Sequence, residues 1–339
     1  MTSSSETVDG PDAVPSDIGL TELFAPVQVE LDQVQRELVR DLAPGEPDLE
    51  PLVDLAVSFR GKQLRPAMVC LSGLAVGSIG PAHVHVGKVV ELLHTATLVH
   101  DDVLDGARLR RRQTTVNAAY GTEVPVLLGD YIYARAFHMA VSMDDPTCSR
   151  VLSEAVRQIC QGEITQILHR FDFDWDEPRY FRVIADKTAC LYAVSCQLGA
   201  YHAGGTPEQC AALHTYGMEI GIAFQIIDDC LDLGGDESVV GKSLGTDLSK
   251  GKLTLPLLWL MREPTRRTAL QELMQTGASE PELLVALRRD FPLEEALAYS
   301  SVVARQRVEV ARRALDGFAP SPAVDSLDRI AGYVLERSL

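Results

Sequence analysis

The sequence predicts an all-α fold, organised as a single large helical bundle. After about Thr21, apolar residues recur at spacings of three and four along most of the chain, which is the period of a buried helix face. Alternating patterns bounded by Gly or Asn turns, which are typical of strands, are nearly absent. Because 46% of the 339 residues are hydrophobic, the chain has enough apolar material for a large core.

The chain is expected to divide into a short tail and one helical domain. Its first residues are rich in Ser, Pro and Asp, a composition typical of disordered segments. They lack the positively charged and apolar regions of a signal peptide. We therefore expect a disordered tail over residues 1–18 and a helical domain over residues 19–339.

Long segments carry the helical period, and Gly, Pro and Asp mark the connections between them. Helices are predicted over residues 84–104, 124–141, 151–168, 180–203, 208–233, 293–315 and 323–335. Connections are predicted at residues 77–81, 144–146, 174–178, 204–207 and 234–251. Several of these helices are long and apolar around much of their circumference, which indicates the interior of a bundle.

The overall charge and the cysteines exclude several classes of protein. With 48 acidic and 31 basic residues, the net charge is −17, so the general field of the chain repels nucleic acid and anionic membrane surfaces. Any anionic ligand must be held by local clusters of Lys and Arg. No apolar run is long enough to cross a membrane. The seven cysteines form no CxxC pair, which indicates free thiols and a cytoplasmic location.

Two short stretches share the pattern Asp-Asp-x-x-Asp. VHDDVLDGARLRRR carries Asp101, Asp102 and Asp105, and FQIIDDCLD carries Asp228, Asp229 and Asp232. Each pattern ends an apolar helix and projects from one side of it. Like charges at i,i+4 repel, and negative charge near a helix C-terminus opposes the helix dipole. Either these are solvated helix ends, or a bound divalent cation removes both penalties.

The ligand type favours magnesium over zinc. Carboxylate oxygens suit Mg²⁺, which keeps several waters and is usually completed by substrate phosphates. The two aspartate triplets contain no Cys or His, which argues against zinc. If the triplets face each other, they can bracket a cluster of Mg²⁺ ions with a diphosphate between them.

Basic residues that could face such a diphosphate occur in several sets. They are Lys62 and Arg65 in GKQLRP, the pair Arg110 and Arg111, Lys187 with Thr188, Lys242, and Lys250 with Lys252. Each set alone is commonly a solvated surface, but in so acidic a chain they together indicate an anion site. None forms the GxxxxGK[ST] or GxGxxG pattern of a nucleotide-binding fold.

The order and spacing of these motifs resemble the trans-type polyprenyl diphosphate synthases, in particular medium- and long-chain members of the octaprenyl type. The resemblance runs from Gly61 to about Leu258 through GKQLRP, LLHTATLVHDDVLDGARLRRRQTT, GDYIYARA, QGEITQ, KTA, FQIIDDCLD and GKSLGTDLSKGKLTLP. It implies an all-α homodimer with a deep central cavity between helices. It also implies head-to-tail (1'-4) addition of isopentenyl diphosphate to an allylic diphosphate such as farnesyl or geranylgeranyl diphosphate.

Carried over residue by residue, the resemblance implies three sets of binding residues. The ligands of Mg²⁺, about three ions per site, would be Asp101, Asp102, Asp105, Asp228, Asp229 and Asp232. The allylic diphosphate would be held by Arg110, Lys187, Thr188, Gln225, Lys242 and Lys252. Isopentenyl diphosphate would be held by Lys62, Arg65, His94 and Arg111. The catalytic residues among these would be Asp101, Asp102, Asp105, Lys187, Thr188, Gln225 and Asp228.

Two details of this assignment stay open. His94 and Gln225 could instead be core polar residues bonded to the backbone. Arg112 stands where the family usually has Gly after the paired arginines, and an extra cation there could shift the affinity for diphosphate.

The residues just before the first aspartates bear on product length. Thr97 and Ala96 are small, where short-chain members of the family carry a bulky aromatic plug. We therefore expect a tunnel that continues past farnesyl length, with a floor from Phe137, His138, Met139 and Met143 on the next helix. The expected product is hexaprenyl to decaprenyl diphosphate, as used for quinone side chains and delivered to a membrane.

Two other functions remain possible from the sequence. A terpene cyclase shares the first aspartate pattern, but it would not need the basic residues of GKQLRP or the Arg110–Arg111 pair. A non-catalytic subunit of a heteromeric prenyl synthase would keep the fold, although such subunits tend to lose an aspartate triplet or the lysines.

Overall fold

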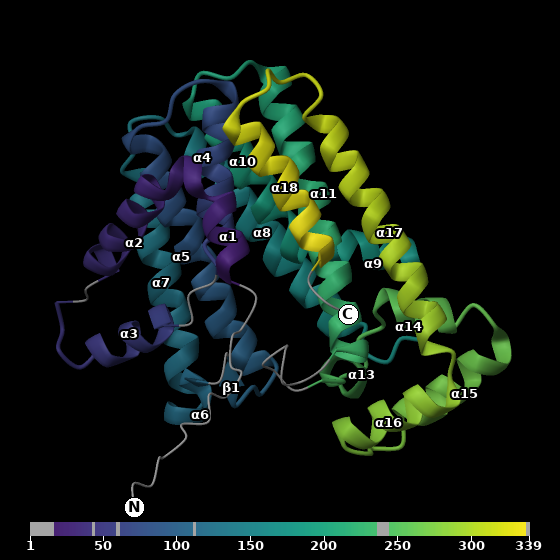
Figure 1. Ribbon diagram of the computed structural model, residues 1–339. Coiled ribbons are helices and arrows are strands. Elements are labelled where there is room, and N and C mark those ends of the chain that lie inside the picture. The colour runs from purple at the N-terminus through teal and green to yellow at the C-terminus, as the bar shows by residue number, and fades with distance from the viewer. Residues whose placement is uncertain (1–16, 43–44, 59–61, 111–112, 236–243, 337–339) are drawn as a thin grey trace, which may run out of the picture.

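The computed structural model describes residues 17–42, 45–58, 62–110, 113–235 and 244–336. These residues are mostly helical, and the long helices lie side by side in a bundle (Figure 1). This confirms the predicted all-α fold. The expected tail over residues 1–18 lies almost entirely outside the described residues, so the division into tail and domain stays a prediction.

The helices follow one another with short connections. The chain begins with α1 (Asp17–Leu23), the 3-10 helix η1 (Ala25–Val27), α2 (Gln28–Leu42), α3 (Glu50–Ser58), α4 (Leu64–Val76) and α5 (Pro81–Leu104). It continues with α6 (Val116–Tyr120), α7 (Glu123–Val141), α8 (Thr147–Leu168), α9 (Glu177–Ile184), the π-helical turn η2 (Ala185–Ala189), α10 (Cys190–His202) and α11 (Pro207–Gly234). It ends with α13 (Thr246–Ser249), α14 (Leu255–Leu260), α15 (Pro264–Met274), α16 (Glu280–Asp290), α17 (Leu293–Ala314) and α18 (Pro322–Glu336).

The core is organised around α10. This helix packs against α11, α4, α8 and α5, and its buried side chains point in nearly all directions. Its residues belong to both apolar clusters, one shared with α11 and α17 and the other with α5 and α7. A helix that is apolar all round belongs in the interior of a bundle, as the sequence predicted for this segment.

The two helices that carry the aspartates have well-defined ends. Pro81 begins α5, and its last turn is followed by Gly106, at φ +60°. Thr206 and Gln209 form a reciprocal capping box at the start of α11, which then runs without a break to Gly234. Such caps fix where each helix starts and stops. The aspartates therefore occupy the final turns of two rigid helices.

The structure differs from the predicted helices in two places beside the aspartates, and α13 also lies within the connection predicted over residues 234–251. A short antiparallel hairpin, β1 (Leu109–Arg110) and β2 (Gln113–Thr114), follows the first aspartates. The helix predicted over residues 180–203 is interrupted by the π-helical turn η2. Neither Gly nor Pro marks this turn in the sequence, so the helical period alone could not locate it. Both differences lie beside the aspartates, and both carry predicted site residues.

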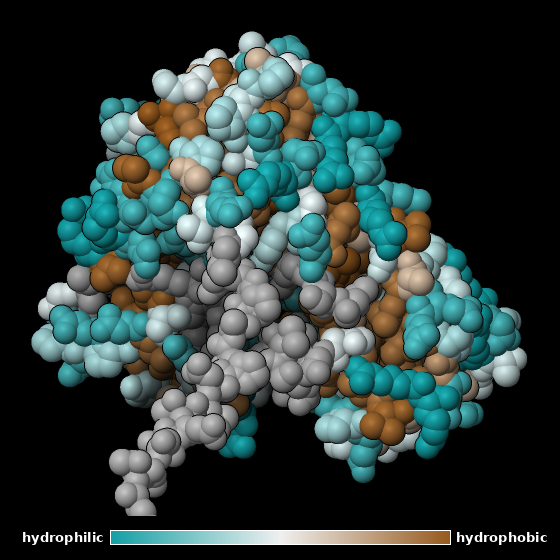
Figure 2. Space-filling view, viewed as in Figure 1, coloured by the Kyte–Doolittle hydropathy of each residue, from teal (hydrophilic) through white to brown (hydrophobic). Residues whose placement is uncertain are grey.

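On the face shown in Figure 2, hydrophilic residues predominate along the outer side of α17 and around α15. Among the described helices, none combines the length and the apolar character needed to cross a membrane.

Candidate active site

The first aspartate triplet lies where α5 ends. Asp102 is buried, while Asp101 and Asp105 are partly exposed. Asp105 accepts ion-pair contacts from Lys250 at 2.9 Å and from Lys252 at 3.4 Å. The carboxylates are thus held close to cations from the segment that follows α13.

The pKa values of this triplet move in opposite directions. Burial raises the pKa of Asp101, and the neighbouring Glu163 and Asp105 carboxylates raise it further against the effect of Lys187. Burial also raises the pKa of Asp102. Burial alone would raise the pKa of Asp105 as well, but Lys252, Lys250 and Lys187 together lower it. A cation placed between Asp101 and Asp102 would relieve the cost of their burial.

The hairpin supplies one predicted basic residue to this triplet. The Arg110 guanidinium on β1 donates from Nε to Asp102 Oδ1 at 2.9 Å, and its Nη2 lies 2.9 Å from the same oxygen. The hairpin is held close to α5, because the Thr115 hydroxyl donates to the Ala107 carbonyl at 2.7 Å. Arg110 is therefore fixed beside the aspartates, and its role in binding the same ligand stays a prediction.

The second triplet, at the end of α11, is more deeply buried. Asp229 accepts from the Tyr180 hydroxyl at 2.7 Å on one oxygen and from the Gln225 amide at 2.8 Å on the other. Asp232 accepts from the backbone N–H of Asp247 at 3.1 Å. Asp228 is partly exposed. Burial, followed by the Asp247 carboxylate, raises the pKa of Asp229.

The π-helical turn carries Lys187 and Thr188 into the same region. Lys187 donates to Glu163 at 2.7 Å and to Gln166 at 3.1 Å, both on α8. The Thr188 hydroxyl donates to the Gln225 side-chain carbonyl at 2.8 Å. Burial would lower the pKa of Lys187, but Glu163 and Asp101 raise it above its usual value. π-helical turns inside helices are frequent at functional sites.

A close approach between α8 and the π-helical turn η2 brings Lys187 beside Glu163 and Gln166. A Cβ atom built on Gly162 of α8 would lie 2.8 Å from the Lys187 backbone nitrogen. Only glycine allows α8 to pass the π-helical turn at this distance. The glycine of the QGEITQ stretch therefore has a packing role next to Glu163 and Gln166.

Lys252 joins the two triplets into one site. Its ammonium lies 3.4 Å from Asp105 of the first triplet and 3.2 Å from the Asp247 carboxylate. The backbone of Asp247 in turn bonds to Asp232 of the second triplet. The ends of α5 and α11, far apart in the sequence, thus face one shared region.

The donor set of this region fits magnesium. Six carboxylates and no Cys or His make up the two triplets, and oxygen ligands are those that Mg²⁺ prefers. Within the described residues, no three His, Cys, Asp or Glu side chains lie together closely enough to enclose a metal ion.

The residues predicted for isopentenyl diphosphate lie on either side of this region. Arg65 of α4 stacks on the Tyr192 ring at 4.1 Å, one turn after Thr188. Lys62 donates to the Tyr333 hydroxyl of α18 at 2.6 Å. His94 lies on α5, two turns before Asp101, and is partly buried. Of the remaining predicted site residues, Arg111 and Lys242, together with Arg112, lie outside the described residues.

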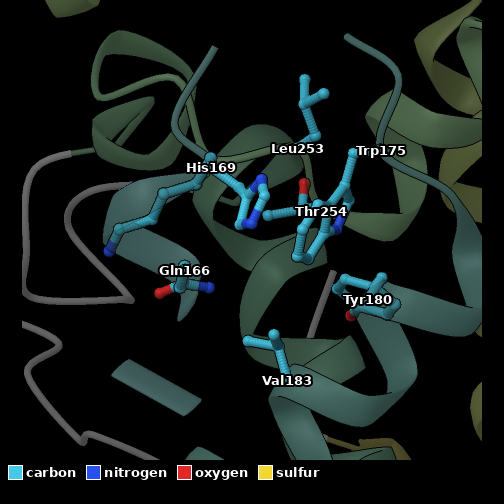
Figure 3. A pocket seen from close by; sticks show the side chains of 8 residues that line it. Gln166, His169, Trp175, Tyr180, Val183, Leu253 and Thr254 are labelled. Carbon is cyan, nitrogen blue, oxygen red and sulfur yellow. The ribbon is translucent and has the colours of Figure 1, made fainter. Parts of the chain in front are cut away.

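A small pocket adjoins the site. It measures about 20 Å³ and is lined by Gln166, His169, Trp175, Tyr180, Val183, Lys252, Leu253 and Thr254. In Figure 3, His169, Trp175 and Tyr180 surround it from the end of α8 and the start of α9. This volume holds one water molecule and no isoprene unit. The deep central cavity stays a prediction.

The residues predicted to line the product tunnel differ in how far their side chains are buried. Ala96 and Met139 are buried in the apolar cluster around α5 and α7, and Phe137 and Met143 pack against it. His138 is exposed, so it does not line the interior. The expectation that it forms part of the floor is wrong, because its side chain lies on the outer face of α7.

Several residues of the site were given no role by the sequence. Glu163 and Gln166 lie in a quoted motif, but nothing indicated that they bond to Lys187. Tyr180 bonds to Asp229, which is 49 positions away, and no local pattern links the two. Asp247 lies in α13, a helix of four residues, which is too short to show a period in the sequence.

Comparisons with known proteins agree with this geometry. The sequence model of the family described as "Polyprenyl synthetase" matches residues 46–289. The octaprenyl diphosphate synthase of Escherichia coli (strain K12) is 46% identical over 213 residues, which cover 63% of this chain and 66% of that protein. The heptaprenyl diphosphate synthase component 2 of Bacillus subtilis (strain 168) is 32% identical over 91% of this chain and 88% of that protein.

Solved structures share the fold as well. The crystal structure of a polyprenyl synthase from Caulobacter crescentus CB15, complexed with calcium and isoprenyl diphosphate, has a TM-score of 0.84 and 29% identity. It covers 96% of this chain and 99% of that one. From the matched family model and these relatives, we conclude that the chain belongs to the polyprenyl synthetase family.

Proposed function

We propose that the protein is a Mg²⁺-dependent trans-prenyltransferase. It condenses isopentenyl diphosphate with an allylic diphosphate, such as farnesyl or geranylgeranyl diphosphate, to give a longer all-trans polyprenyl diphosphate. The single observation that carries this proposal is the link from Asp105 through Lys252 and Asp247 to Asp232. It gathers two acidic helix ends and a buried cation around one region, as a metal-bound diphosphate requires.

The binding roles follow from the contacts. Bound Mg²⁺, for which we propose a cluster of about three ions, supplies Lewis-acid stabilisation of the leaving diphosphate. Asp101, Asp102, Asp105, Asp228 and Asp232 would hold these ions through their carboxylate oxygens. Both oxygens of Asp229 are engaged by Tyr180 and Gln225, so we assign it to support of Asp228.

The reaction breaks one carbon–oxygen bond, forms one carbon–carbon bond and releases one proton. The allylic C1–O bond breaks, and its electron pair leaves with the diphosphate, whose oxygens Lys187, Lys252 and Arg110 would hold. The double bond of isopentenyl diphosphate supplies the electrons of the new C1–C4' bond. The proton at C2' then leaves to the released diphosphate, and the double bond forms again between C2' and C3'.

Two side chains are suited to face the developing positive charge. The Thr188 hydroxyl and the Gln225 amide are bonded to each other, and Gln225 is anchored to Asp229. The dipoles of Thr188 and Gln225 are therefore fixed before the substrate arrives, which is the condition for electrostatic stabilisation of a transition state. Aliphatic helices around the site would exclude the water that otherwise captures a carbocation.

We place the product in the medium-to-long range, hexaprenyl to decaprenyl, suited to quinone side chains and delivery to a membrane. Small residues at Ala96 and Thr97 support this, as do the relatives named octaprenyl and heptaprenyl diphosphate synthase. Seven free cysteines, six of them buried, support a cytoplasmic location, because thiols stay reduced there.

We also propose a homodimer. Leu127 of α7 and Ile164 and Leu168 of α8 are 68%, 57% and 75% exposed, on helices that pack against each other. Large apolar side chains exposed on neighbouring helices are typical of a subunit interface. Light scattering should give a mass near twice 37.0 kDa, and a monomer at micromolar concentration would contradict this.

One assay tests the activity. Purified protein is incubated with Mg²⁺, farnesyl diphosphate and labelled isopentenyl diphosphate, and the dephosphorylated products are separated by chain length. Linear prenols longer than farnesol support the proposal, and their length fixes the product. Cyclic hydrocarbons would instead identify a terpene cyclase. No product from the protein alone, with activity on adding a second subunit, would identify one component of a heteromeric synthase, as the name of the Bacillus subtilis relative describes.

A further inference from the structure

One carboxylate of the site faces three cations. Asp105 Oδ1 lies 2.9 Å from Lys250 Nζ, 3.4 Å from Lys252 Nζ and 3.9 Å from Arg170 Nη2. These basic side chains are 17%, 11% and 27% exposed. Asp247 also pairs with Lys252, at 3.2 Å, so two carboxylates face three cations. In a chain of net charge −17, three basic side chains around one carboxylate are a distinct local feature.

Arg170, just after the end of α8, is incompletely bonded. Its Nε atom is buried and has no hydrogen-bond partner in the part of the chain that the structure describes. Its contact with Asp105, at 3.9 Å, is longer than a hydrogen bond. A guanidinium normally binds anions through several parallel N–H···O bonds. Arg170 is therefore oriented toward Asp105, and its Nε donor has no acceptor among the described residues.

A backbone clamp holds Arg170 next to the two lysines. The Phe171 backbone N–H donates to the Gly251 carbonyl at 2.8 Å. Both residues have left-handed backbone conformations, with φ of +59° for Phe171 and +73° for Gly251. A Cβ atom on Gly251 would lie 2.4 Å from the Phe171 ring. A bulky residue in this conformation is a strained feature that a fold keeps where geometry matters. The clamp places Arg170, on the segment after α8, close to Lys250 and Lys252, on the segment after α13.

We propose that Arg170 is a diphosphate-binding residue, which completes with Lys250 and Lys252 a three-cation site for the diphosphate of the allylic substrate. The proposal rests on the proposed function, because that diphosphate belongs to its substrate. If Asp105 holds a metal ion, its carboxylate can neutralise Lys250 and Arg170 only in part. The oxygens of a diphosphate would supply further negative charge and accept hydrogen bonds from the Arg170 guanidinium.

Binding of inorganic pyrophosphate tests the proposal without turnover. Isothermal titration calorimetry on the full chain, with and without Mg²⁺, compares the wild type with Arg170→Ala and Arg170→Gln. Both variants should weaken pyrophosphate binding by about tenfold in the presence of Mg²⁺, the lower end of what one charged hydrogen-bonding group contributes. Arg157→Ala is the matched control, because Arg157 is an exposed arginine of α8 that pairs with Glu154 at 2.6 Å. It should bind pyrophosphate as the wild type does.

The outcomes separate this inference from the proposed function. Unchanged pyrophosphate affinity in both Arg170 variants would overturn the inference and leave the prenyltransferase proposal untouched. A wild type that binds Mg²⁺ and pyrophosphate but makes no prenyl product would overturn the function and not the role of Arg170. If Arg170→Ala loses its helical circular dichroism signal, the pyrophosphate affinity of Arg170→Gln decides the test, because Gln keeps most of the side-chain stem. In active enzyme, KM should rise for the allylic substrate, and a rise confined to isopentenyl diphosphate would contradict the placement.

Discussion

The hydrogen bond between Tyr180 and Asp229 offers a sharp test of the second triplet. Tyr180→Phe removes only the hydroxyl, which donates to Asp229 Oδ2 at 2.7 Å. Burial raises the pKa of Tyr180 well above its usual value, so this hydroxyl stays a donor at any working pH. Asp229 is only 4% exposed, so little water is available to replace the lost bond. The remaining donor is the Gln225 amide on the other oxygen.

The size of the effect follows from this burial. Removing one donor from a buried, charged acceptor costs about 2 kcal/mol. With an unfolding entropy of about 2.1 cal/mol/K per residue, a chain of 339 residues has roughly 0.7 kcal/mol/K in total. The expected fall in Tm is therefore about 3 °C. Because Asp229 loses its fixed orientation beside Asp228, kcat should fall by about tenfold with little change in KM.

The assay is thermal unfolding by circular dichroism at pH 8, combined with steady-state kinetics. Tyr201→Phe is a matched control, since the Tyr201 hydroxyl donates to Asp145 at the same 2.7 Å but on the surface. The Tm and the kcat of Tyr201→Phe should equal those of the wild type. If the two variants behave alike, or if Tyr180→Phe keeps full kcat, then Asp229 does not depend on Tyr180 and the reasoning fails.

Three further predictions concern other parts of the molecule. Lys187→Ala should lower kcat by about a hundredfold, the effect of removing one donor to a developing negative charge, while helicity stays the same; steady-state rates near the wild type would contradict the role of Lys187. Burial lowers the pKa of His83, so the unfolded chain binds the proton first, and the stability that His83 contributes is full above about pH 6.5 and lost as pH falls below it. The free energy of unfolding in urea, measured at pH 7.5 and 5.5, should therefore fall less toward pH 5.5 in His83→Gln than in the wild type, and equal slopes would count against the argument. Ala96→Phe should shorten the product by filling the core beside the first triplet, and an unchanged product distribution would remove the tunnel argument.

The sequence predicted the parts of the fold that depend on period and spacing. The helices over residues 84–104 and 208–233 are confirmed, because their apolar faces repeat over many turns and end at Gly and Asp. The aspartate triplets needed no structure to be singled out. The role of Tyr180 as a donor to Asp229 depends on the packing of α9 against α11, which no local pattern encodes.

Other parts of the site depend on the path of the backbone. Arg170 lies beside Lys250 only because the Phe171 and Gly251 backbones bond to each other. Two residues 80 positions apart are brought together by a left-handed turn in each, and a Phe in that conformation is not foreseeable from propensity. The hairpin that carries Arg110 is similarly short, with two residues in each strand, too few for an alternating pattern.

The π-helical turn η2 changes the rotational register of side chains between α9 and α10, which otherwise form one continuous helix. A regular α-helix advances by about 100° per residue, and a wider turn accommodates one residue more before the helix resumes. Tyr180 before the turn and Tyr192 after it are thus set at different angles from those that an uninterrupted helix would give them. Deleting a single residue between 185 and 189 would leave α10 in nearly its present orientation, because the wide turn already absorbs one residue more than an α-helical turn. The change would fall on the turn itself, which carries Lys187 and Thr188 into the site, so a change in length here should impair the site while the packing of α10 against α4 and α11 is kept.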